Sequence, residues 1–269
     1  KTLMLLIFWV GMSNAANLKP IVELTDAARV WVAYQGQPLY YASASSQYQI
    51  SNQQPKVLIM ADAKSEVSLS PSANYRVFSL LQDMNEIKDG QRYSDYIVMN
   101  HRDELMYKVS RGSAPDLKPA VAAVSDLGVL ALADPIRAHI YFYKEGELIA
   151  EGQLYETEGD FSLERKVKLQ WVGERCYVLL ERPGRNGSAP NNVLFIGINW
   201  DGRGQRTAVL PFSYLQQYIF QNHRFFISGY NYDPDDQQME PLIIEINQDG
   251  KVLWNNENFG HELSISANG

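Results

Sequence analysis

Residues 67–110 contain the pattern that decides the fold. They read VSLSPSANYRVFSLL at 67–81, then a polar stretch, then DYIVMNHRDELMYKVS at 95–110. Short apolar runs rich in Val, Ile, Tyr and Phe, separated by Pro, Ser, Asn and Asp, are typical of strands joined by turns. We interpret this stretch as two consecutive β-hairpins, which together make one four-stranded antiparallel sheet.

The same pattern recurs along the chain. Similar stretches lie at Val121–Leu154, Lys166–Pro211 and Tyr214–Trp254, and another copy begins at Glu262–Gly269. The repeat length is about 48 residues with four short strands in each copy, which is typical of propeller blades. The sequence therefore predicts an all-β protein, a β-propeller of four-stranded antiparallel blades. The first-hairpin turns are expected near Asn74, Gly128, Glu174, Asn222 and Asn268.

The second hairpin of each copy has its own turn signal. Lys144-Glu145-Gly146, Asp201-Gly202 and Asp249-Gly250 supply the positive φ angles that tight hairpins require. Within each copy, the first strand is expected innermost, around the propeller axis. The next strand is apolar throughout, which predicts burial on both faces. These buried strands are Tyr75–Leu81, Val129–Ala133, Tyr177–Leu180 and Phe225–Ile227.

Ala28–Ala61 is interpreted as one more, shorter copy. Its strands are expected at Ala28–Tyr34, Leu39–Ser43, Gln47–Ser51 and Lys56–Ala61. Residues 213–220 (SYLQQYIF) have some helical character, but the repeat register favours a strand. We expect about five blades in one repeat domain at residues 16–269. Because the last copy stops in its first turn, we also expect the chain to be an incomplete fragment of a longer protein.

The amino-terminal segment predicts export. Residues 1–15 (KTLMLLIFWVGMSNA) combine a positive start, a short apolar run and small residues before a cleavage point, as in a signal peptide. We therefore expect a secreted, periplasmic or cell-surface protein. There is no second long apolar run, so no membrane span is expected in the mature chain. The net charge of −7 argues against nucleic acid as a partner, because such binding needs basic surface.

One stretch carries a family resemblance. Ser68-Leu69-Ser70-Pro71-Ser72-Ala73-Asn74-Tyr75 resembles the SPDGRYLAF signature of WD-like propellers of bacterial secreted and periplasmic proteins, including the TolB type. Ser266-Ala267-Asn268-Gly269 repeats its core. The resemblance implies a propeller fold and leaves function open, since such families include binding scaffolds, peptidase-associated propellers and large surface proteins. The tryptophan-docking repeats of quinoprotein dehydrogenases are not evident, which weakens a quinone-cofactor interpretation.

Motifs for catalysis, cofactors and metals are sparse. There is no Gly-x-Ser-x-Gly elbow, and we expect no cofactor and no catalytic residue of the chain's own. The four histidines are isolated, and His101 and His223 fall at expected turns. The single cysteine, Cys176, is interpreted as a buried apolar residue rather than a reactive thiol. Asn231, Asp233 and Asp235 form a weak calcium candidate, but a solvated turn is the favoured interpretation.

Carboxylates offer a third, weaker possibility. Glycosidases use a pair of acids across the scissile bond, and propeller glycosidases place such acids near the axis. The sequence alone does not show whether any two of the available acids face each other. Glu66 and Asp126 are the two that we would mutate first. The full set of candidates is Asp62, Glu66, Asp126, Asp134 and Glu262.

The loops between second and third strands carry the binding prediction. They are expected at Gln82–Ser94, Asp134–Arg137, Arg182–Asn191 and Asn231–Met239, and they vary in length while the hairpin turns stay short. Variable loops on a regular scaffold often carry binding, although drift in solvated loops explains the variation equally well. The candidate contact residues are Arg182, Arg185, Asn186 and Tyr232.

Two functional hypotheses follow. The first is a secreted β-propeller scaffold that binds a protein or glycan partner through these loops without catalysis. The second is the propeller domain of a larger secreted hydrolase, a peptidase or glycosidase, whose catalytic part lies beyond residue 269.

Overall fold

The computed structural model describes residues 29–31, 39–42, 46–51, 54–60, 66–81, 92–102, 104–113, 120–155, 166–182, 192–233 and 235–256. The expected signal peptide, the expected loop at Gln82–Ser94 and the copy at Glu262–Gly269 lie largely or wholly outside these residues. The described residues form β-strands and turns, arranged as five four-stranded sheets.

Each sheet is antiparallel and takes its four strands in chain order. The first contains β1 (Arg29–Trp31), β2 (Leu39–Ala42), β3 (Ser46–Ser51) and β4 (Gln54–Met60). The second contains β5 (Glu66–Leu69), β6 (Tyr75–Leu81), β7 (Arg92–Asn100) and β8 (Leu105–Ser113). The third contains β9 (Val121–Val124), β10 (Leu130–Asp134), β11 (His139–Lys144) and β12 (Glu147–Gln153).

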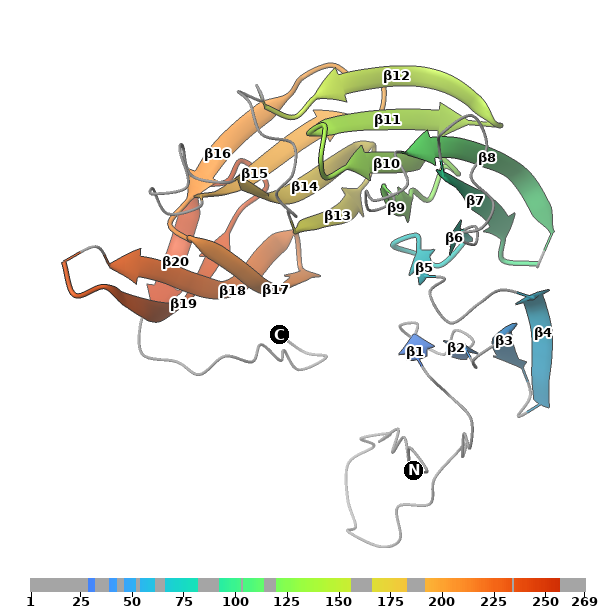
Figure 1. Cartoon of the computed structure of the whole chain (residues 1–269), viewed down its shortest axis with the longest axis horizontal. Coiled ribbons are helices and arrows are strands. Elements are labelled where there is room, and N and C mark those ends of the chain that lie inside the picture. The colour runs from blue at the N-terminus through green and yellow to red at the C-terminus, as the bar shows by residue number, and fades with distance from the viewer. Residues whose placement is uncertain are drawn as a thin grey trace, which may run out of the picture.

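The last two sheets follow the same order. The fourth contains β13 (Val167–Val172), β14 (Arg175–Arg182), β15 (Asn192–Asn199) and β16 (Arg206–Leu210). The fifth contains β17 (Tyr214–Gln221), β18 (Arg224–Asp233), β19 (Gln238–Ile246) and β20 (Val252–Asn256). Figure 1 shows the five sheets fanned in an arc, with the first strand of each toward the middle and the last strand on the outside. This is the predicted arrangement of propeller blades.

Most strand predictions are confirmed. The short copy at Ala28–Ala61 forms the β1–β4 sheet, and SYLQQYIF forms β17 as the repeat register indicated. One loop prediction is wrong. Asn231–Met239 was expected to be a loop, but β18 continues to Asp233 and β19 begins at Gln238, with Asp233 opposite Gln238. The physical reason is that the alternating tyrosines Tyr230 and Tyr232 favour continued strand pairing in this hairpin.

The core lies between neighbouring sheets. The β9–β12 and β13–β16 sheets pack through an alanine-rich surface on one side, and Trp171 and Cys176 lie on the other. The β13–β16 and β17–β20 sheets pack through aromatic side chains, with the Phe195 and Phe225 rings 4.9 Å apart in an edge-on arrangement. Stacking sheets face to face buries apolar surface, which is the main favourable contribution to folding. The described residues include no helix long and apolar enough to cross a membrane.

Candidate functional site

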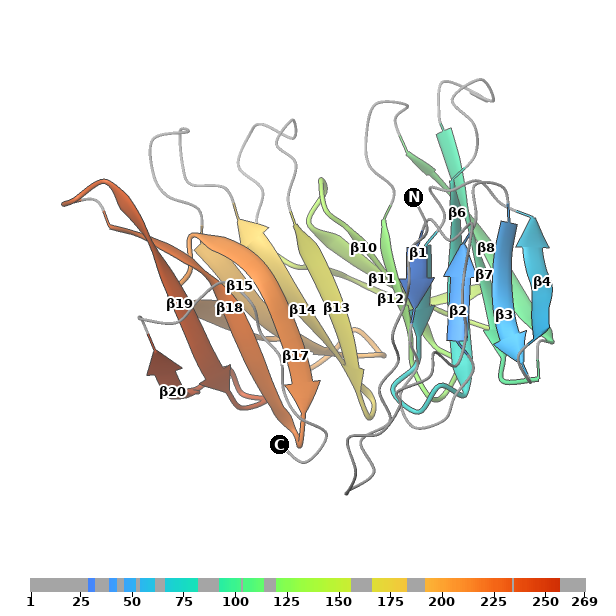
Figure 2. The same ribbon diagram turned by 90° about the horizontal axis from the view of Figure 1, so that it is seen from below.

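The sheets have two different ends, which Figure 2 separates clearly. Strands β13 and β17 finish at the lower end in this view, and β14 and β18 finish at the upper end. The lower end, which carries the hairpin turns, is named here the turn face. The upper end, where second strands finish and third strands begin, is named the loop face. The two predicted binding residues that the structure describes, Arg182 and Tyr232, belong to the loop face.

Arg182 lies at the end of β14 on the loop face. Its guanidinium carbon lies 5.4 Å from the centre of the Tyr155 ring, which follows β12 in the neighbouring sheet. A cation over an aromatic ring is attracted by the electron density of the ring face. Both side chains are partly buried, and Tyr155 packs against the core between the two sheets. Arg182 is therefore held at the junction of two blades, next to the connection from β14 to β15.

Glu181, the preceding residue, links β14 to the following blade. Its Oε1 accepts a hydrogen bond of 2.6 Å from the Leu215 N–H in β17, and the Lys166 Nζ lies 3.8 Å from the same oxygen. Lys166 also donates to the Leu215 carbonyl oxygen over 3.0 Å. Burial raises the pKa of the Glu181 carboxyl, while the Leu215 hydrogen bond and the Lys166 charge oppose that effect. The three residues form a polar clasp between two blades.

Tyr232 lies in β18 and its contacts are separate from those of Arg182. The Tyr232 N–H donates to the buried Ser213 Oγ over 3.0 Å, and the Tyr232 side chain is half-buried. The structure therefore places Arg182 and Tyr232 in two clusters in different sheets. Arg185 and Asn186, the other two predicted contact residues, lie outside the described residues.

The weak calcium candidate takes the form of a turn. The Asp235 N–H donates to Asp233 Oδ1 over 2.8 Å, so this carboxylate supports the start of the β18–β19 turn. Asn231 is exposed within β18. In the part of the chain that the structure describes, no three His, Cys, Asp or Glu side chains gather to hold a metal ion.

Asp126 and Asp134, the two candidate glycosidase acids whose side chains the structure describes, do not face each other. Asp126 accepts hydrogen bonds from the Ser72 N–H (2.8 Å) and the Ser72 hydroxyl (3.0 Å), which ties two turns together on the turn face. Asp134 accepts from the backbone of Ile136 and Arg137 at the other end of β10. A five-residue strand such as β10 is about 16 Å long, beyond the roughly 5–9.5 Å that separates paired glycosidase acids. The Glu66 side chain, Asp62 and Glu262 lie outside the description.

The histidines and the cysteine occupy ordinary positions. His101 and His223 are exposed in turns, as predicted, and His139 in β11 lies 3.7 Å from Glu151. Cys176 is fully buried beside Trp171, and burial raises the pKa of its thiol. The interpretation of Cys176 as a buried apolar residue is confirmed.

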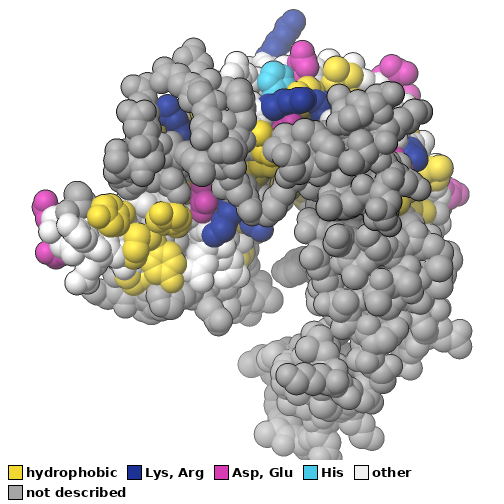
Figure 3. All heavy atoms as spheres, in the orientation of Figure 1, with side chains coloured by type: hydrophobic (Ala, Val, Ile, Leu, Met, Phe, Trp, Pro, Cys, Tyr) yellow, Lys and Arg dark blue, Asp and Glu magenta, His cyan; other side chains and the backbone are white. Residues whose placement is uncertain are grey.

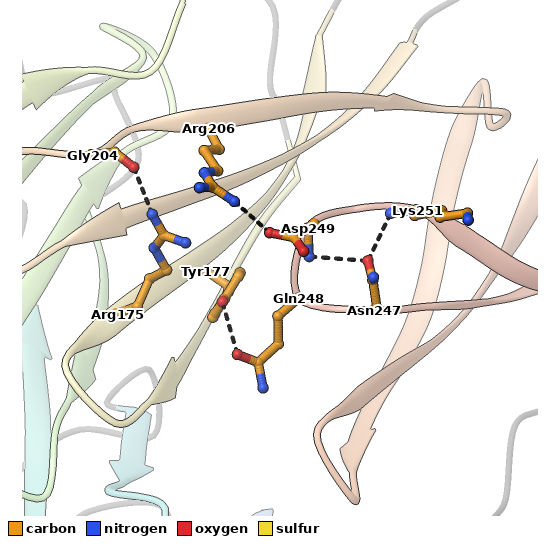
Figure 4. Close-up of polar contacts among 8 residues, drawn as sticks. All are labelled: Arg175, Tyr177, Gly204, Arg206, Asn247, Gln248, Asp249 and Lys251. Carbon is orange, nitrogen blue, oxygen red and sulfur yellow. Dashed lines mark hydrogen bonds and ion pairs between the residues drawn. The ribbon is translucent and has the colours of Figure 1, made fainter.

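The turn face also carries contacts between blades. Figure 4 shows the β19–β20 turn reaching the β13–β16 sheet, where Arg206 Nη1 donates to Asp249 Oδ1 over 2.6 Å. In the same view, the Tyr177 hydroxyl contacts Gln248 Oε1 at 3.3 Å. The turn is also ordered internally, because Asn247 Oδ1 accepts hydrogen bonds from the backbone N–H groups of Asp249 and Lys251. These contacts join the β17–β20 sheet to the β13–β16 sheet at the turn face.

Sequence reasoning missed the Glu181 clasp and the Tyr155 contact. A signal for the first existed, because the hairpin register that pairs Val167 with Leu180 also sets Lys166 opposite Glu181. Oppositely charged residues across a strand pair are a recognised stabilising pattern. Tyr155 gave no comparable signal, since its partner lies in another blade.

Comparison with known proteins supports the fold. No protein-family model matches the chain, and no curated protein sequence matches it. Among solved structures, the acylaminoacyl peptidase of Pyrococcus horikoshii gives a TM-score of 0.53 at 14% identity, over 86% of this chain and 38% of the peptidase. The periplasmic gluconolactonase of Pseudomonas aeruginosa gives 0.44 at 12% identity, over 85% of this chain and 69% of the lactonase.

A WD40 domain is also similar. That of SCAP from fission yeast gives a TM-score of 0.36 at 8% identity, over 86% of this chain and 74% of the domain. The likeness in fold rests on the peptidase match, and an identity of 14% indicates nothing finer than the fold. The chain is thus a β-propeller by fold, and it spans about 38% of the length of the peptidase that it resembles.

Proposed function

We propose that this β-propeller is a binding scaffold that holds a protein partner on its loop face through Arg182 and its surroundings. The observation that carries the proposal is the Arg182–Tyr155 pair, which is anchored between two blades at the end where the connections vary. Arg and Tyr are enriched among the residues that dominate protein interfaces. Residues of this kind usually have a partly buried side chain whose tip can still contact a partner.

The geometry favours a protein over a glycan. Glycan sites present a free aromatic face for a sugar ring, whereas the Arg182 guanidinium already lies over the ring of Tyr155. The neighbouring clasp adds an exposed charge, since the Lys166 side chain is 58% exposed. Two cations on one face suit an acidic segment of a protein partner.

Matched arginine variants test the proposal. The purified chain is immobilised and incubated with proteins extracted from the envelope of its native cells, and captured proteins are identified by mass spectrometry. We expect capture by the wild type and by Arg206→Ala, whose arginine lies on the turn face, and loss of capture by Arg182→Ala. Equal capture by all three would overturn the proposal.

A glycan partner is the other outcome that the experiment distinguishes. The same three proteins are applied to an array of surface glycans. Glycan binding that is lost in Arg182→Ala but kept in Arg206→Ala would assign the loop face to a glycan and overturn the protein partner.

We also propose that the protein acts outside the cytoplasm. The support is the sequence of residues 1–15, which has the layout of a signal peptide. Expression with this segment, followed by amino-terminal sequencing of the exported protein, tests the point. We expect a mature protein that begins after Ala15, and an intact amino terminus on a protein retained in the cytoplasm would contradict it.

A second function is favoured by one comparison. The match to an acylaminoacyl peptidase covers 38% of that enzyme, which is what a propeller domain of a larger hydrolase would give. In this alternative, the catalytic part lies beyond residue 269 and the propeller serves a peptidase or glycosidase. Reading the coding sequence past residue 269 decides it. A Gly-x-Ser-x-Gly motif in a following α/β region would support the hydrolase, and an adhesion or sorting region would support the binding scaffold.

A further inference from the structure

The fourth strand of each sheet is an edge strand on the outside of the arc. Within the described residues, β4, β8, β12, β16 and β20 each pair with a strand on one side only. The unpaired backbone groups of an edge strand can pair with a strand of another chain. Proteins prevent this with β-bulges, with charged side chains or with proline at the edge. We therefore compared the five outer strands for these protective features.

Four of the five outer strands contain a β-bulge. In the first, second, third and fifth sheets, the register between the third and fourth strands shifts by one residue. The extra residue of each outer strand is Leu58, Met106, Ile149 or Leu253, respectively. A bulge interrupts the ladder and twists the edge, so a second chain finds no regular strand to pair with.

Charged side chains protect some of the same strands. Lys56 lies in β4, Lys108 and Arg111 lie in β8, and Glu147 and Glu151 lie in β12. Two identical edges of this kind would bring like charges into one small contact, which is destabilising. Strand β20 has no charge, but it does have the bulge.

Strand β16 differs from the other four. It pairs with β15 without a register shift, from Val193 opposite Leu210 to Gly197 opposite Arg206. After Arg206 its residues are uncharged, and they include no proline. Thr207 and Val209 share one face of the strand, where Thr207 is exposed and Val209 is 67% exposed. The outer side of β16 is therefore a regular, neutral edge with an exposed apolar side chain, which is the kind of edge that pairs with another strand.

We propose that β16 pairs with β16 of a second copy of this chain, antiparallel and about a two-fold axis at Ala208. The contact joins two four-stranded sheets into one sheet of eight strands. Two identical strands are self-complementary in this arrangement, as a two-fold interface requires. Thr207 of each chain lies opposite the partner's Val209, so the exposed face of each strand is covered by that of the other.

The charges on β16 are compatible with a second copy. In this register, each Arg206 lies opposite a leucine, and the two Arg206 residues are four residues apart along the strands. That separation is about 13 Å at the rise of a β-strand, which is longer than the screening length of roughly 8 Å at physiological ionic strength. Each Arg206 is also neutralised in its own chain by Asp249, 2.6 Å away. The same pairing on β8 or β12 would bring unshielded like charges together.

Sedimentation velocity of the 269-residue chain over a range of concentrations tests the proposal. Five residues from each chain make a small contact, and small contacts are weak and transient, so we expect a monomer–dimer equilibrium with a Kd of about 10–100 μM. The double variant Thr207→Lys/Val209→Lys places lysine opposite lysine and should weaken dimerisation at least about tenfold. Both side chains are exposed, so the variant should fold, and its thermal unfolding is compared with that of the wild type.

A charge-reversed variant makes the test specific. Thr207→Glu/Val209→Glu should also be monomeric by itself, because glutamate then lies opposite glutamate. An equal mixture of the lysine and glutamate variants should form a dimer again, since each lysine now lies opposite a glutamate. Recovery in the mixture also shows that both variants are folded. Leu148→Lys/Ile149→Lys is the matched control on the bulged strand β12, and it should dimerise as the wild type does.

A second apolar surface provides the competing explanation for any association. Figure 3 shows hydrophobic side chains gathered over the β17–β20 sheet, on the left of the view, and Trp254 in β20 is 47% exposed. Trp254→Lys should leave the dimer unchanged. Dimerisation that is lost in Trp254→Lys but kept in the β16 lysine variant would overturn the proposal. A wild-type chain that stays monomeric at every concentration would also overturn it, as would a mixture of the charged variants that fails to dimerise.

Discussion

The turn face and the loop face hold the blades together in different ways. On the turn face, one contact recurs: Gly146, Gly202 and Gly250 each bring a hairpin turn against the outer strand of the preceding sheet. On the loop face, the contacts are individual, and the Glu181 clasp and the Arg182–Tyr155 pair have no described repeat. A repeated contact follows from the repeated architecture, whereas an individual contact marks where one blade differs from the others.

The difference between the two faces distinguishes residues that stabilise the fold from residues that could bind a partner. The turns at Gly202 and Gly250 leave little space for change, since an added Cβ would lie 3.2 Å and 2.5 Å from the Cβ atoms of Ala150 and Ala208. On the loop face, the connections after β14 and β18 differ in length and composition. Changes at the tightly packed turn glycines and at the Glu181 clasp should therefore cost stability, and changes in the connections of the loop face should mainly affect binding.

The largest effect is expected at Gly250. Its φ of 78° is unfavourable for any residue with a side chain, and a Cβ there would lie 2.5 Å from the Ala208 Cβ. We expect Gly250→Ala to lower the free energy of unfolding by about 3 kcal/mol, from backbone strain and overpacking together. Equilibrium urea unfolding measures this.

A double variant separates the two causes. Adding Ala208→Gly removes the closest contact and leaves the one with Phe195, so the combined cost should be smaller than the sum of the single costs. Strict additivity would show that the turn does not lie against β16 as described.

The next effect is expected at Glu181, on the loop face. Glu181→Ala leaves the buried Leu215 N–H without its acceptor, and we expect a loss of about 2 kcal/mol in urea unfolding. Glu181→Gln keeps an acceptor oxygen and should cost less, so it serves as the control.

Glu181 also predicts a pH dependence. Burial raises the pKa of its carboxyl above the ordinary value of 4.5, so the folded protein binds this proton more tightly than the unfolded chain. Relative to Glu181→Gln, the wild type should be most stable below pH 4.5 and lose that advantage as the pH rises through the folded-state pKa. A stability difference that stays constant from pH 4 to pH 7 would contradict the burial of this group.

A smaller effect is expected at Asp126. Its carboxylate accepts two hydrogen bonds from Ser72 in an exposed position, so Asp126→Ala should cost about 1 kcal/mol. Ser72→Ala removes one of these bonds, and the double variant should be less destabilised than the sum of the two. Independent effects would show that the two turns are not tied.

The smallest effect is expected at Arg206. The Arg206–Asp249 pair is exposed on both sides, and such surface ion pairs contribute little. Thermal unfolding of Arg206→Ala should shift by no more than about 0.5 kcal/mol, and less at high salt. A larger loss would mean that the turn face depends on charge rather than on the fit of its glycines.

Much of the fold could be predicted from local pattern. Apolar runs such as Tyr75–Leu81 and turn pairs such as Asp249-Gly250 specify strands and hairpins, because side-chain alternation and positive φ angles are local properties. The repeat then gave the four-stranded sheets and their order. The end of β18 was missed, because Asp233 and its neighbours resemble loop residues until β19 pairs with them.

The candidate site was predicted only in part. Arg182 was selected from its position beside a long connection, but its contact with Tyr155 joins two consecutive blades. Asp126 was considered as a catalytic acid and instead holds two turns together. Such contacts depend on how neighbouring blades pack, which the sequence of a single repeat does not predict.

By itself, the sequence determined the period, the hairpins and the glycines that make their turns, since each of these depends on residues close together in the chain. Only the tertiary structure decided that those same glycines lie against the outer strand of the preceding blade, and that Glu181 accepts a hydrogen bond from Leu215 in the following blade. The physical reason is that stacking brings strands about 50 residues apart into contact, and burial and hydrogen bonding between them depend on that geometry rather than on local sequence.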